Sequence, residues 1–306
     1  RDSQGLVDQY LVLEPDVLMG GGSDHFLPAG TPGGKRKDGK DIIAAFRAKG
    51  YQIARNTAEL KAATGARLLG LFAEEDMDFE LDRDPVREPT TAEMAAAALR
   101  ALSGHSPNGF VLLVENENVD TAGHANDAAS LMHALWAFDE AVKVALDFQR
   151  RTPDTLVIIT GDHETGGFSP TYAQRDLSTL SSKNRLYTGD EHLRMLGRIT
   201  MSLNQVKEEL GKKPSGEVLD KLLAGHFPGF RLDPDLRELI LNQKMLERNF
   251  TYLPQNLLGR MVARQTGYYW GTSGHTPEPA VVGATGPGEE LFRGYQDNTD
   301  FGKHLH

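Results

Sequence analysis

Short apolar runs alternate with amphipathic stretches along the chain. The runs rich in Val, Leu and Ile predict buried strands, at residues 16–19, 51–53, 67–72, 109–114 and 155–160. Between them, apolar residues recur at helical spacing. These stretches predict helices at residues 6–13, 41–49, 57–63, 90–102 and 126–150. Strands that alternate with helices predict an α/β fold, with a mostly parallel central sheet and helices on both faces.

The run at residues 109–114 (GFVLLV) predicts a strand buried on both faces, because its apolar residues are consecutive. Polar groups follow it closely: Glu115, then Asp120, then His124. The carboxyl ends of parallel strands are where open α/β sheets place their ligand sites. An acidic loop with a surface histidine is the alternative for this stretch taken alone.

Two further stretches bring candidate chemistry. The predicted strand at residues 155–160 ends in Gly161, followed by Asp162 and His163, and His275 precedes a last short apolar run. Three histidines and three carboxylates suit zinc through imidazole and carboxylate, with an oxygen-rich position for magnesium. Asp120 and His124 are four residues apart, so one helical turn would place both on the same side of an ion.

The stretch at residues 169–269 is mostly polar and helical and lacks strand signals, so it predicts a helical insertion. We therefore expect a single domain over residues 1–306 that contains this insertion. The glycine run at residues 20–22 lacks the ending of a P-loop, and the acidic run at residues 74–84 lacks the glycine and glutamate positions of an EF-hand.

Composition excludes some classes of partner and site. The net charge of −10 leaves no basic stripe for nucleic acid, and the lack of cysteine excludes disulfides and thiolate zinc sites. No apolar run approaches membrane-spanning length, so no membrane partner is expected. The first residue is Arg1 and no signal peptide follows it, so we expect a processed or truncated chain.

Several motifs, in order, resemble those of alkaline phosphatases. Residues 114–124 (VENENVDTAGH) resemble the family's Val-Glu-Gly-Gly-Arg-Ile-Asp…His segment. Residues 160–167 (TGDHETGG) resemble its Thr-Ala-Asp-His-Glu-Thr-Gly-Gly segment, and residues 274–276 with 286–288 are similar to its Gly-His-Thr…Gly-Pro-Gly run. Residues 16–22 match its Asp-Val-Leu-Leu-Gly-Gly-Gly run. The resemblance covers nearly the whole chain apart from the helical insertion.

The resemblance implies two zinc ions and one magnesium ion. Asp120, His124 and His275 would bind the first zinc, Asp162 and His163 would contribute to the second, and Glu115 would bind magnesium. Two ions flanking an in-line phosphoryl transfer serve the attacking and leaving oxygens.

Arg1 matches the arginine with which the family holds phosphate, since a guanidinium can bind two phosphate oxygens at once. The resemblance also implies a homodimer that acts on small phosphate monoesters and is secreted or periplasmic.

The family's nucleophilic serine, in an Asp-Ser-Ala-type motif, belongs well upstream of Arg1 and is not in this chain. Two hypotheses follow. The chain is the carboxyl-terminal part of a metal-dependent phosphomonoesterase that forms a phosphoserine intermediate, or it is a catalytically silent metal-binding or structural fragment. A phosphodiesterase or sulfatase of the same superfamily is a third reading. The Gly-His-Thr and Gly-Gly-Gly runs follow the phosphomonoesterases.

Overall fold

The computed structural model describes residues 2–174, 185–244 and 253–305. The chain divides into two compact units. The first comprises residues 1–78, 83–116 and 137–157, and the second comprises residues 79–82, 117–136 and 158–306.

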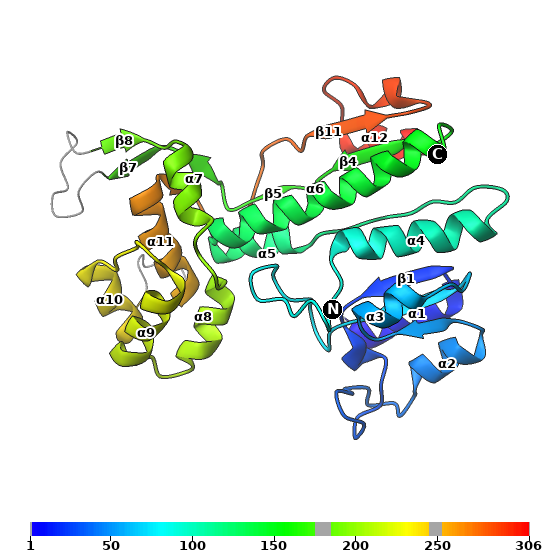
Figure 1. Cartoon of the computed structure of the whole chain (residues 1–306), viewed down its shortest axis with the longest axis horizontal. Helices are drawn as coiled ribbons and strands as arrows, with labels where there is room; N and C mark the ends of the chain where they lie inside the picture. The colour runs from blue at the N-terminus through cyan, green and yellow to red at the C-terminus, as the bar shows by residue number, and fades with distance from the viewer. Residues whose placement is uncertain (1, 175–184, 245–252, 306) are drawn as a thin grey trace. The chain divides into compact units, whose positions relative to one another are not determined.

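The first unit is built on a parallel sheet of three strands (Figure 1). The strand order is β1 (Val17–Gly20), β3 (Leu68–Leu71) and β2 (Gln52–Ala54). In register, Val17 and Gln52 both pair with Leu68. The central strand β3 is buried along its whole length. This confirms the predicted parallel sheet.

Helices cover both faces of this sheet, as the sequence predicts. On one face, α1 (Ser3–Leu13) and α2 (Ile42–Ala48) pack with Leu69 and Leu71 of β3 in one apolar cluster. On the other face, α3 (Thr57–Ala62) and α4 (Thr91–His105) pack with Leu68 in a second cluster. The alternation of β3 side chains between two clusters follows from the period of two in a strand.

The helix α4 begins as the sequence predicts. Thr90 accepts a hydrogen bond from the backbone N–H of Glu93, and the Glu93 carboxylate accepts one from the backbone N–H of Thr90. This reciprocal capping box satisfies two N–H groups that the first turn of a helix leaves without partners.

The prediction of a buried strand at residues 109–114 is wrong. Residues 109–116 are extended but belong to no sheet, and Val111 and Leu113 are 97% and 88% exposed. An apolar run predicts burial of its side chains. The run does not indicate which backbone it would pair with, because strand pairing depends on residues distant in sequence.

The second unit contains α5 (Asn118–Ala125) and the first turns of α6 (Ala128–Arg151), and α6 continues into the first unit. The strand β4 (Val157–Thr160) pairs with β11 (Val282–Thr285). The β4 side chains are half-buried or exposed, whereas the sequence predicts a buried strand. The chain ends with a short 3-10 helix, η3 (Glu289–Phe292), and α12 (Asn298–His304).

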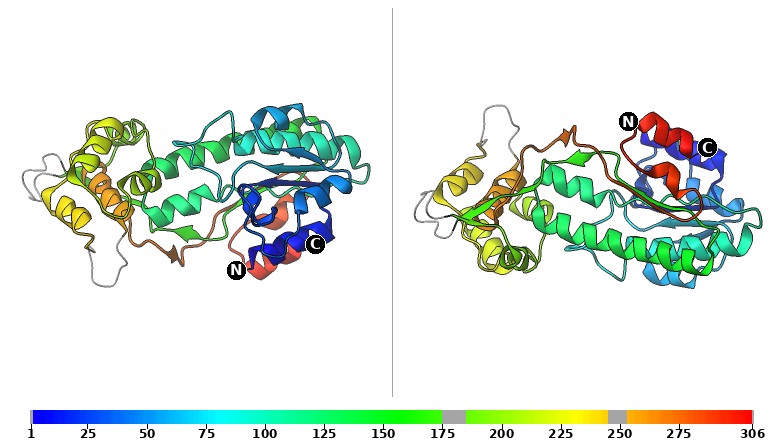
Figure 2. Two further views of the ribbon diagram at one scale, coloured as in Figure 1. Left: turned by 90° about the horizontal axis from the view of Figure 1, so that it is seen from below. Right: turned by 90° about the horizontal axis from the view of Figure 1, so that it is seen from above.

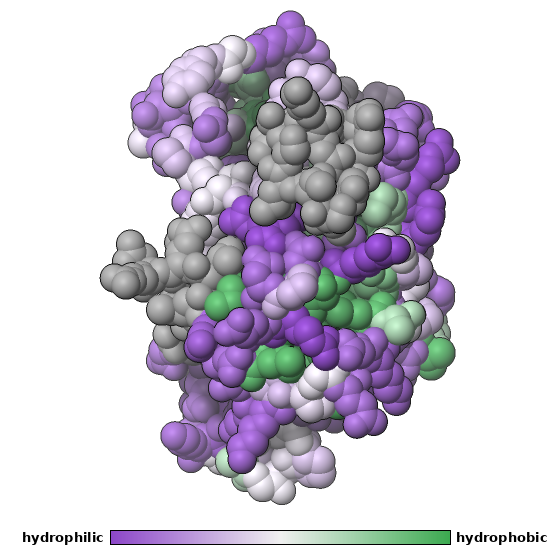
Figure 3. Space-filling view, turned by 90° about the vertical axis from the view of Figure 1, so that its left-hand side faces the viewer, coloured by the Kyte–Doolittle hydropathy of each residue, from purple (hydrophilic) through white to green (hydrophobic). Residues whose placement is uncertain are grey.

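Between residues 185 and 266, the described part of the second unit contains five helices. They are α7 (Asp190–Leu196), α8 (Leu203–Leu210), α9 (Gly216–His226), α10 (Pro234–Leu241) and α11 (Pro254–Thr266). In both views of Figure 2 the yellow and orange helices gather together. Their apolar sides share one core, which includes Leu203, Leu236 and Leu258. The face in Figure 3 is mostly hydrophilic, as expected for amphipathic helices that turn their apolar sides inward.

Short strands also occur within residues 169–269, where the sequence gives no strand signal. They form two antiparallel pairs, β6 (Ser169–Pro170) with β9 (Tyr268–Tyr269) and β7 (Tyr172–Gln174) with β8 (Arg185–Tyr187). Each strand has only two or three residues, too few for a period of two to be recognised. No helix in the described part of the chain is both long and apolar enough to cross a membrane.

Candidate metal centre

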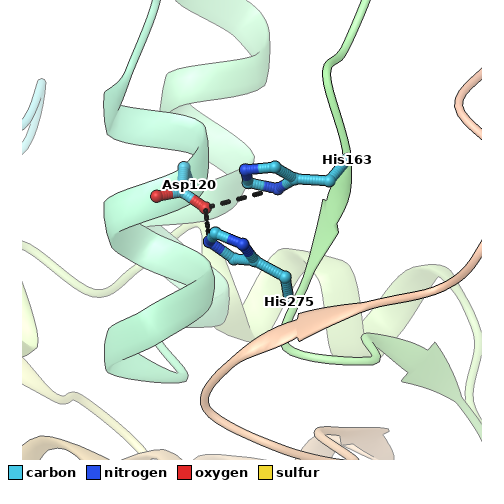
Figure 4. Close-up of side chains that lie close together, drawn as sticks. All are labelled: Asp120, His163 and His275. Carbon is cyan, nitrogen blue, oxygen red and sulfur yellow. Dashed lines mark ion pairs between the residues drawn. The ribbon is translucent and has the colours of Figure 1, made fainter. Parts of the chain in front are cut away.

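Three elements of the second unit bring the candidate ligands together. Asp120 and His124 lie on α5, His163 immediately precedes β5 (Glu164–Thr165), and His275 begins β10 (His275–Thr276). The two short strands pair antiparallel, with His275 opposite Thr165. Figure 4 shows Asp120 facing the rings of His163 and His275. Segments more than 100 residues apart in the sequence therefore meet at one point.

The Asp120 carboxylate is central to the cluster. Its Oδ2 atom lies 3.3 Å from Nε2 of His124, and its Oδ1 atom lies 3.7 Å from Nε2 of His275 and 3.9 Å from Nδ1 of His163. One ligand atom each from Asp120, His163 and His275 lies within 4.8 Å of the others. Asp120 and His124 are one helical turn apart on α5, as the sequence predicts.

The imidazole of His124 is held in one tautomer. Its Nδ1 atom lies 2.6 Å from the carbonyl oxygen of Ser273, and a carbonyl can only accept, so Nδ1 carries the hydrogen. In the neutral ring, Nε2 therefore carries the lone pair, and it lies 3.2 Å from Nε2 of His275. Metal-binding histidines characteristically hold the second ring nitrogen in this way.

This arrangement fits a cation. Nε2 of His124 and Nε2 of His275 lie 3.2 Å apart, and each lies within 3.7 Å of one oxygen of the Asp120 carboxylate. Lone pairs on such atoms repel one another when nothing positive lies between them. The rings of His163 and His275 also stack, with centroids 3.6 Å apart. Imidazole nitrogens with carboxylate oxygens are the donor set that zinc prefers in cysteine-free sites.

Thr165 and Glu164 support the ligands, although neither is among the site residues predicted from the sequence. The Thr165 hydroxyl donates to the Asp120 carboxylate. The Glu164 carboxylate accepts from the backbone N–H groups of Gly167 and Phe168 and from the Thr276 hydroxyl. Glu164 thereby links the turn after β5 to β10, next to His275.

The pKa of Glu164 is lowered by its surroundings. Partial burial raises it, but the Thr276 hydroxyl, the two backbone N–H groups and the nearby His163 together lower it by more. Glu164 is therefore ionised at neutral pH, which strengthens the three hydrogen bonds that it accepts.

Gly123 allows α5 to lie directly against β5. A Cβ atom at this position would come within 2.8 Å of the Thr165 carbonyl oxygen and 2.9 Å of its side chain. Real Cβ atoms do not approach backbone that closely. The absence of a side chain at position 123 thus sets the spacing between Asp120 on the helix and His163 beside the strand.

The remaining predicted residues are Asp162, Glu115 and Arg1. Asp162 is adjacent to His163, with Oδ2 3.2 Å from its Nε2, but its side chain is 88% exposed. Glu115 is exposed and lies in the first unit, in the extended segment before α5. Arg1 lies outside the described residues. The structure therefore brings together four of the predicted side chains: Asp120, His124, His163 and His275.

Comparisons with known proteins agree on one family. The sequence profile of alkaline phosphatases matches residues 2–306. The repressible alkaline phosphatase of Saccharomyces cerevisiae is 31% identical over 322 residues, which cover 95% of this chain and 56% of the yeast protein. Alkaline phosphatase 4 of Bacillus subtilis is 29% identical, over 93% of this chain and 55% of that protein.

Comparison with solved structures indicates the same family as the sequence comparisons. The crystal structure of Thermus thermophilus alkaline phosphatase superposes with a TM-score of 0.85 and 30% identity, over 99% of this chain and 64% of that one. The chain spans a little over half the length of the yeast and Bacillus relatives. The α/β fold is therefore alkaline-phosphatase-like, and the chain belongs to the alkaline phosphatase family.

Proposed function

We propose that the whole protein is a metal-dependent hydrolase of phosphate monoesters, and that this chain supplies most of its metal ligands. The cluster of Asp120, His163 and His275, with His124 beside Asp120 and His275, carries the proposal. Family membership supports the reaction class, since the named relatives are phosphatases. The fold alone would not support a reaction class, because one fold can host many activities.

We assign each residue to an ion according to the donor atoms, nitrogen or oxygen, that its side chain offers. Asp120, His124 and His275 would hold one zinc ion, Asp162 and His163 would contribute to a second, and Glu115 would bind magnesium. When bound, two such ions stabilise the attacking and leaving oxygens of a phosphoryl transfer. The nitrogen-rich cluster suits zinc, whereas Glu115 offers only oxygen, which suits magnesium.

Residues of this chain orient the metal ligands and leave them accessible to a substrate. The Ser273 carbonyl fixes the His124 tautomer, and the Thr165 hydroxyl holds Asp120. The side chains of Asp120, His124 and His275 are a third to a half exposed, so a phosphate group from solvent can reach them. Arg1 would hold two oxygens of that phosphate.

We place the nucleophilic serine, and the phosphoserine intermediate that it forms, in a part of the whole protein outside these 306 residues. The 306-residue chain by itself then binds zinc without turning over substrate, which is the silent-fragment alternative for the isolated chain. The homodimer and the exported location stay expectations that rest on the family.

The test compares hydrolysis of p-nitrophenyl phosphate at alkaline pH by the whole protein, with and without EDTA. EDTA should abolish the activity and zinc should restore it. His275→Ala should lower kcat/KM by about 100-fold or more, since a metal supplies several kcal/mol of charge stabilisation. The matched control is His105→Ala, at the exposed end of α4 in the first unit.

Two results would contradict the proposal. Activity that His275→Ala leaves unchanged would remove His275 from the metal site. Turnover by the isolated 306-residue chain would show that the nucleophile lies within it and would reject the silent-fragment alternative.

A further inference from the structure

Asn126 ends α5, and its side chain makes contacts that ending a helix does not require. Its backbone lies in the left-handed region, with a φ of +55°, and the residue is only 9% exposed. Glycine and asparagine are the residues that adopt this conformation most readily at the end of a helix. Glycine would therefore end α5 without any side chain, and the amide group of Asn126 is free to serve another role.

The Asn126 amide joins three segments of the second unit. Its Nδ2 atom donates to the carbonyl oxygen of Gly123 on α5, over 3.1 Å, and to that of Thr272, over 2.8 Å. Its Oδ1 atom accepts a hydrogen bond of 2.7 Å from Nδ2 of Asn256 on α11. Both hydrogens of the amide and its oxygen are thus in use. An ionised aspartate has no hydrogen to donate and could not make the first two bonds.

The contact with Thr272 bears directly on a candidate metal ligand. Thr272 immediately precedes Ser273, whose carbonyl oxygen fixes the tautomer of His124. The backbone N–H of Thr272 also donates to the Gly166 carbonyl, so this residue is anchored on both sides. Asn126 therefore holds the peptide group next to the carbonyl that orients the His124 ring.

Asn256 connects this support to the five helices α7 to α11. Besides its bond to Asn126, its Nδ2 atom donates to the carbonyl oxygen of His124, over 3.3 Å. Gly259, about one turn further along α11, permits the approach, because a Cβ atom there would come within 2.4 Å of the Asn126 carbonyl oxygen. The apolar side of α11, which includes Leu258, is buried in the core of these helices, so Asn256 stands on a rigid element.

We infer that Asn126 and Asn256 are positioning residues for His124, which hold the end of α5 and the Ser273 carbonyl in the placement that presents the His124 ring to a metal ion. Both asparagines act through the backbone of neighbouring residues and not by binding the ion. The inference rests on the proposed function for the role of His124. It adds that α11, a helix of the polar stretch between the motifs, supports the metal centre.

The variant Asn126→Gly separates this role from helix capping. Glycine keeps the left-handed backbone at the end of α5 and removes only the amide, so a residue needed for capping alone would tolerate the change. Asn256→Ala removes the partner amide in the same way. The matched control is Asn242→Gly, because Asn242 ends α10 in the same unit and donates to a carbonyl of its own helix, that of Glu238.

Each variant of the whole protein is freed of metal and titrated with zinc by calorimetry, and with cobalt(II), whose visible absorption bands depend on the arrangement of the ligands. Asn126→Gly and Asn256→Ala should each lower the zinc affinity by about 10-fold or more and shift the cobalt bands. The double variant should lose less than the two single losses combined, because both side chains act through one contact. The control should match the unmodified protein in both titrations.

His275→Ala, which removes a ligand, is the reference for the cobalt bands and should change them most. Bands that respond to His275→Ala but to neither asparagine variant would overturn the inference alone, since Asn126 would then serve only to end α5. Bands that His275→Ala leaves unchanged would contradict the proposed function, and this inference with it. If circular dichroism shows that Asn126→Gly does not fold, Asn256→Ala decides the question by the same two titrations.

Discussion

At the residue scale, two ligands of the candidate metal centre have a partner that fixes the side chain, and the backbone beside the other two is fixed by Glu164. The Ser273 carbonyl fixes the His124 ring, the Thr165 hydroxyl fixes Asp120, and the Glu164 carboxylate ties down the turn and the strand beside His163 and His275. Such supporting groups govern metal affinity nearly as strongly as the ligands themselves.

Thr165 gives a prediction at this scale. Thr165→Val keeps the shape of the side chain and removes the hydroxyl that donates to Asp120, so zinc affinity should fall by about 10-fold or more. Competition with a chromophoric chelator measures the affinity. The control is Thr160→Val, whose hydroxyl donates only to the neighbouring Gly161 carbonyl. Equal affinities for both variants would show that the Asp120 hydrogen bond does not support the site.

The sequence predicted the ligands better than their supports. Asp120 and His124 are recognisable because a spacing of four residues on a helix has a fixed geometry. Ser273 acts through its backbone carbonyl, which every residue possesses, so no side-chain pattern could have identified it. Glu164 and Thr165 stand within the predicted motif, but their roles depend on partners distant in sequence. Glu164 contacts Thr276 on β10, and Thr165 contacts Asp120 on α5.

At the element scale, the close approach of α5 to β5 sets the geometry of the site. Apart from the strand expected at residues 109–114, the helices and strands predicted one by one have boundaries within a few residues of those observed, since each has a local period or a capping signal. The two-residue strands β5 and β10 were not predicted. They have no period, and only the pairing of His275 with Thr165 defines them.

Gly123 carries the prediction at this scale. Gly123→Ala should push α5 from β5 and destabilise the protein by about 1–3 kcal/mol, as overpacking does in tight interiors, and should also weaken zinc binding. Urea unfolding followed by circular dichroism measures the stability.

The matched control for this prediction is Gly104→Ala. This glycine is also helical, but a Cβ there would meet nothing within 4 Å. The control should gain roughly 0.5–1 kcal/mol from helix propensity alone. A neutral or stabilising effect of Gly123→Ala would mean that the two elements do not depend on this contact for their spacing.

At the scale of the whole molecule, the cores of the two units are separate. The first unit buries both faces of its parallel sheet, and the second gathers five helices around an apolar cluster of its own. The four clustered ligands all belong to the second unit. The sequence could not predict that Val111 and Leu113 are exposed, because a buried segment and an exposed one can have the same apolar sequence pattern.

Zinc should therefore stabilise the second unit selectively. A ligand that binds only the folded form, at 1,000 times its dissociation constant, stabilises that form by about 4 kcal/mol. Hydrogen exchange with mass spectrometry should show slower exchange in α5, β5 and β10 when zinc is added. The strand β3 of the first unit serves as the internal reference. Slowing of β3 to the same extent would contradict the assignment of the site to the second unit.

Two hydrogen bonds at the site affect the entropy of metal binding. Thr165 donates one to Asp120, and His124 donates the other to Ser273. Immobilising a free side chain on binding costs about 0.5–1.5 kcal/mol. Here the protein meets that entropic cost when it folds, because both side chains are already held. An incoming ion therefore needs to displace water but not to order these two ligands. Binding should accordingly show a smaller unfavourable entropy than in a variant whose ligands rotate freely.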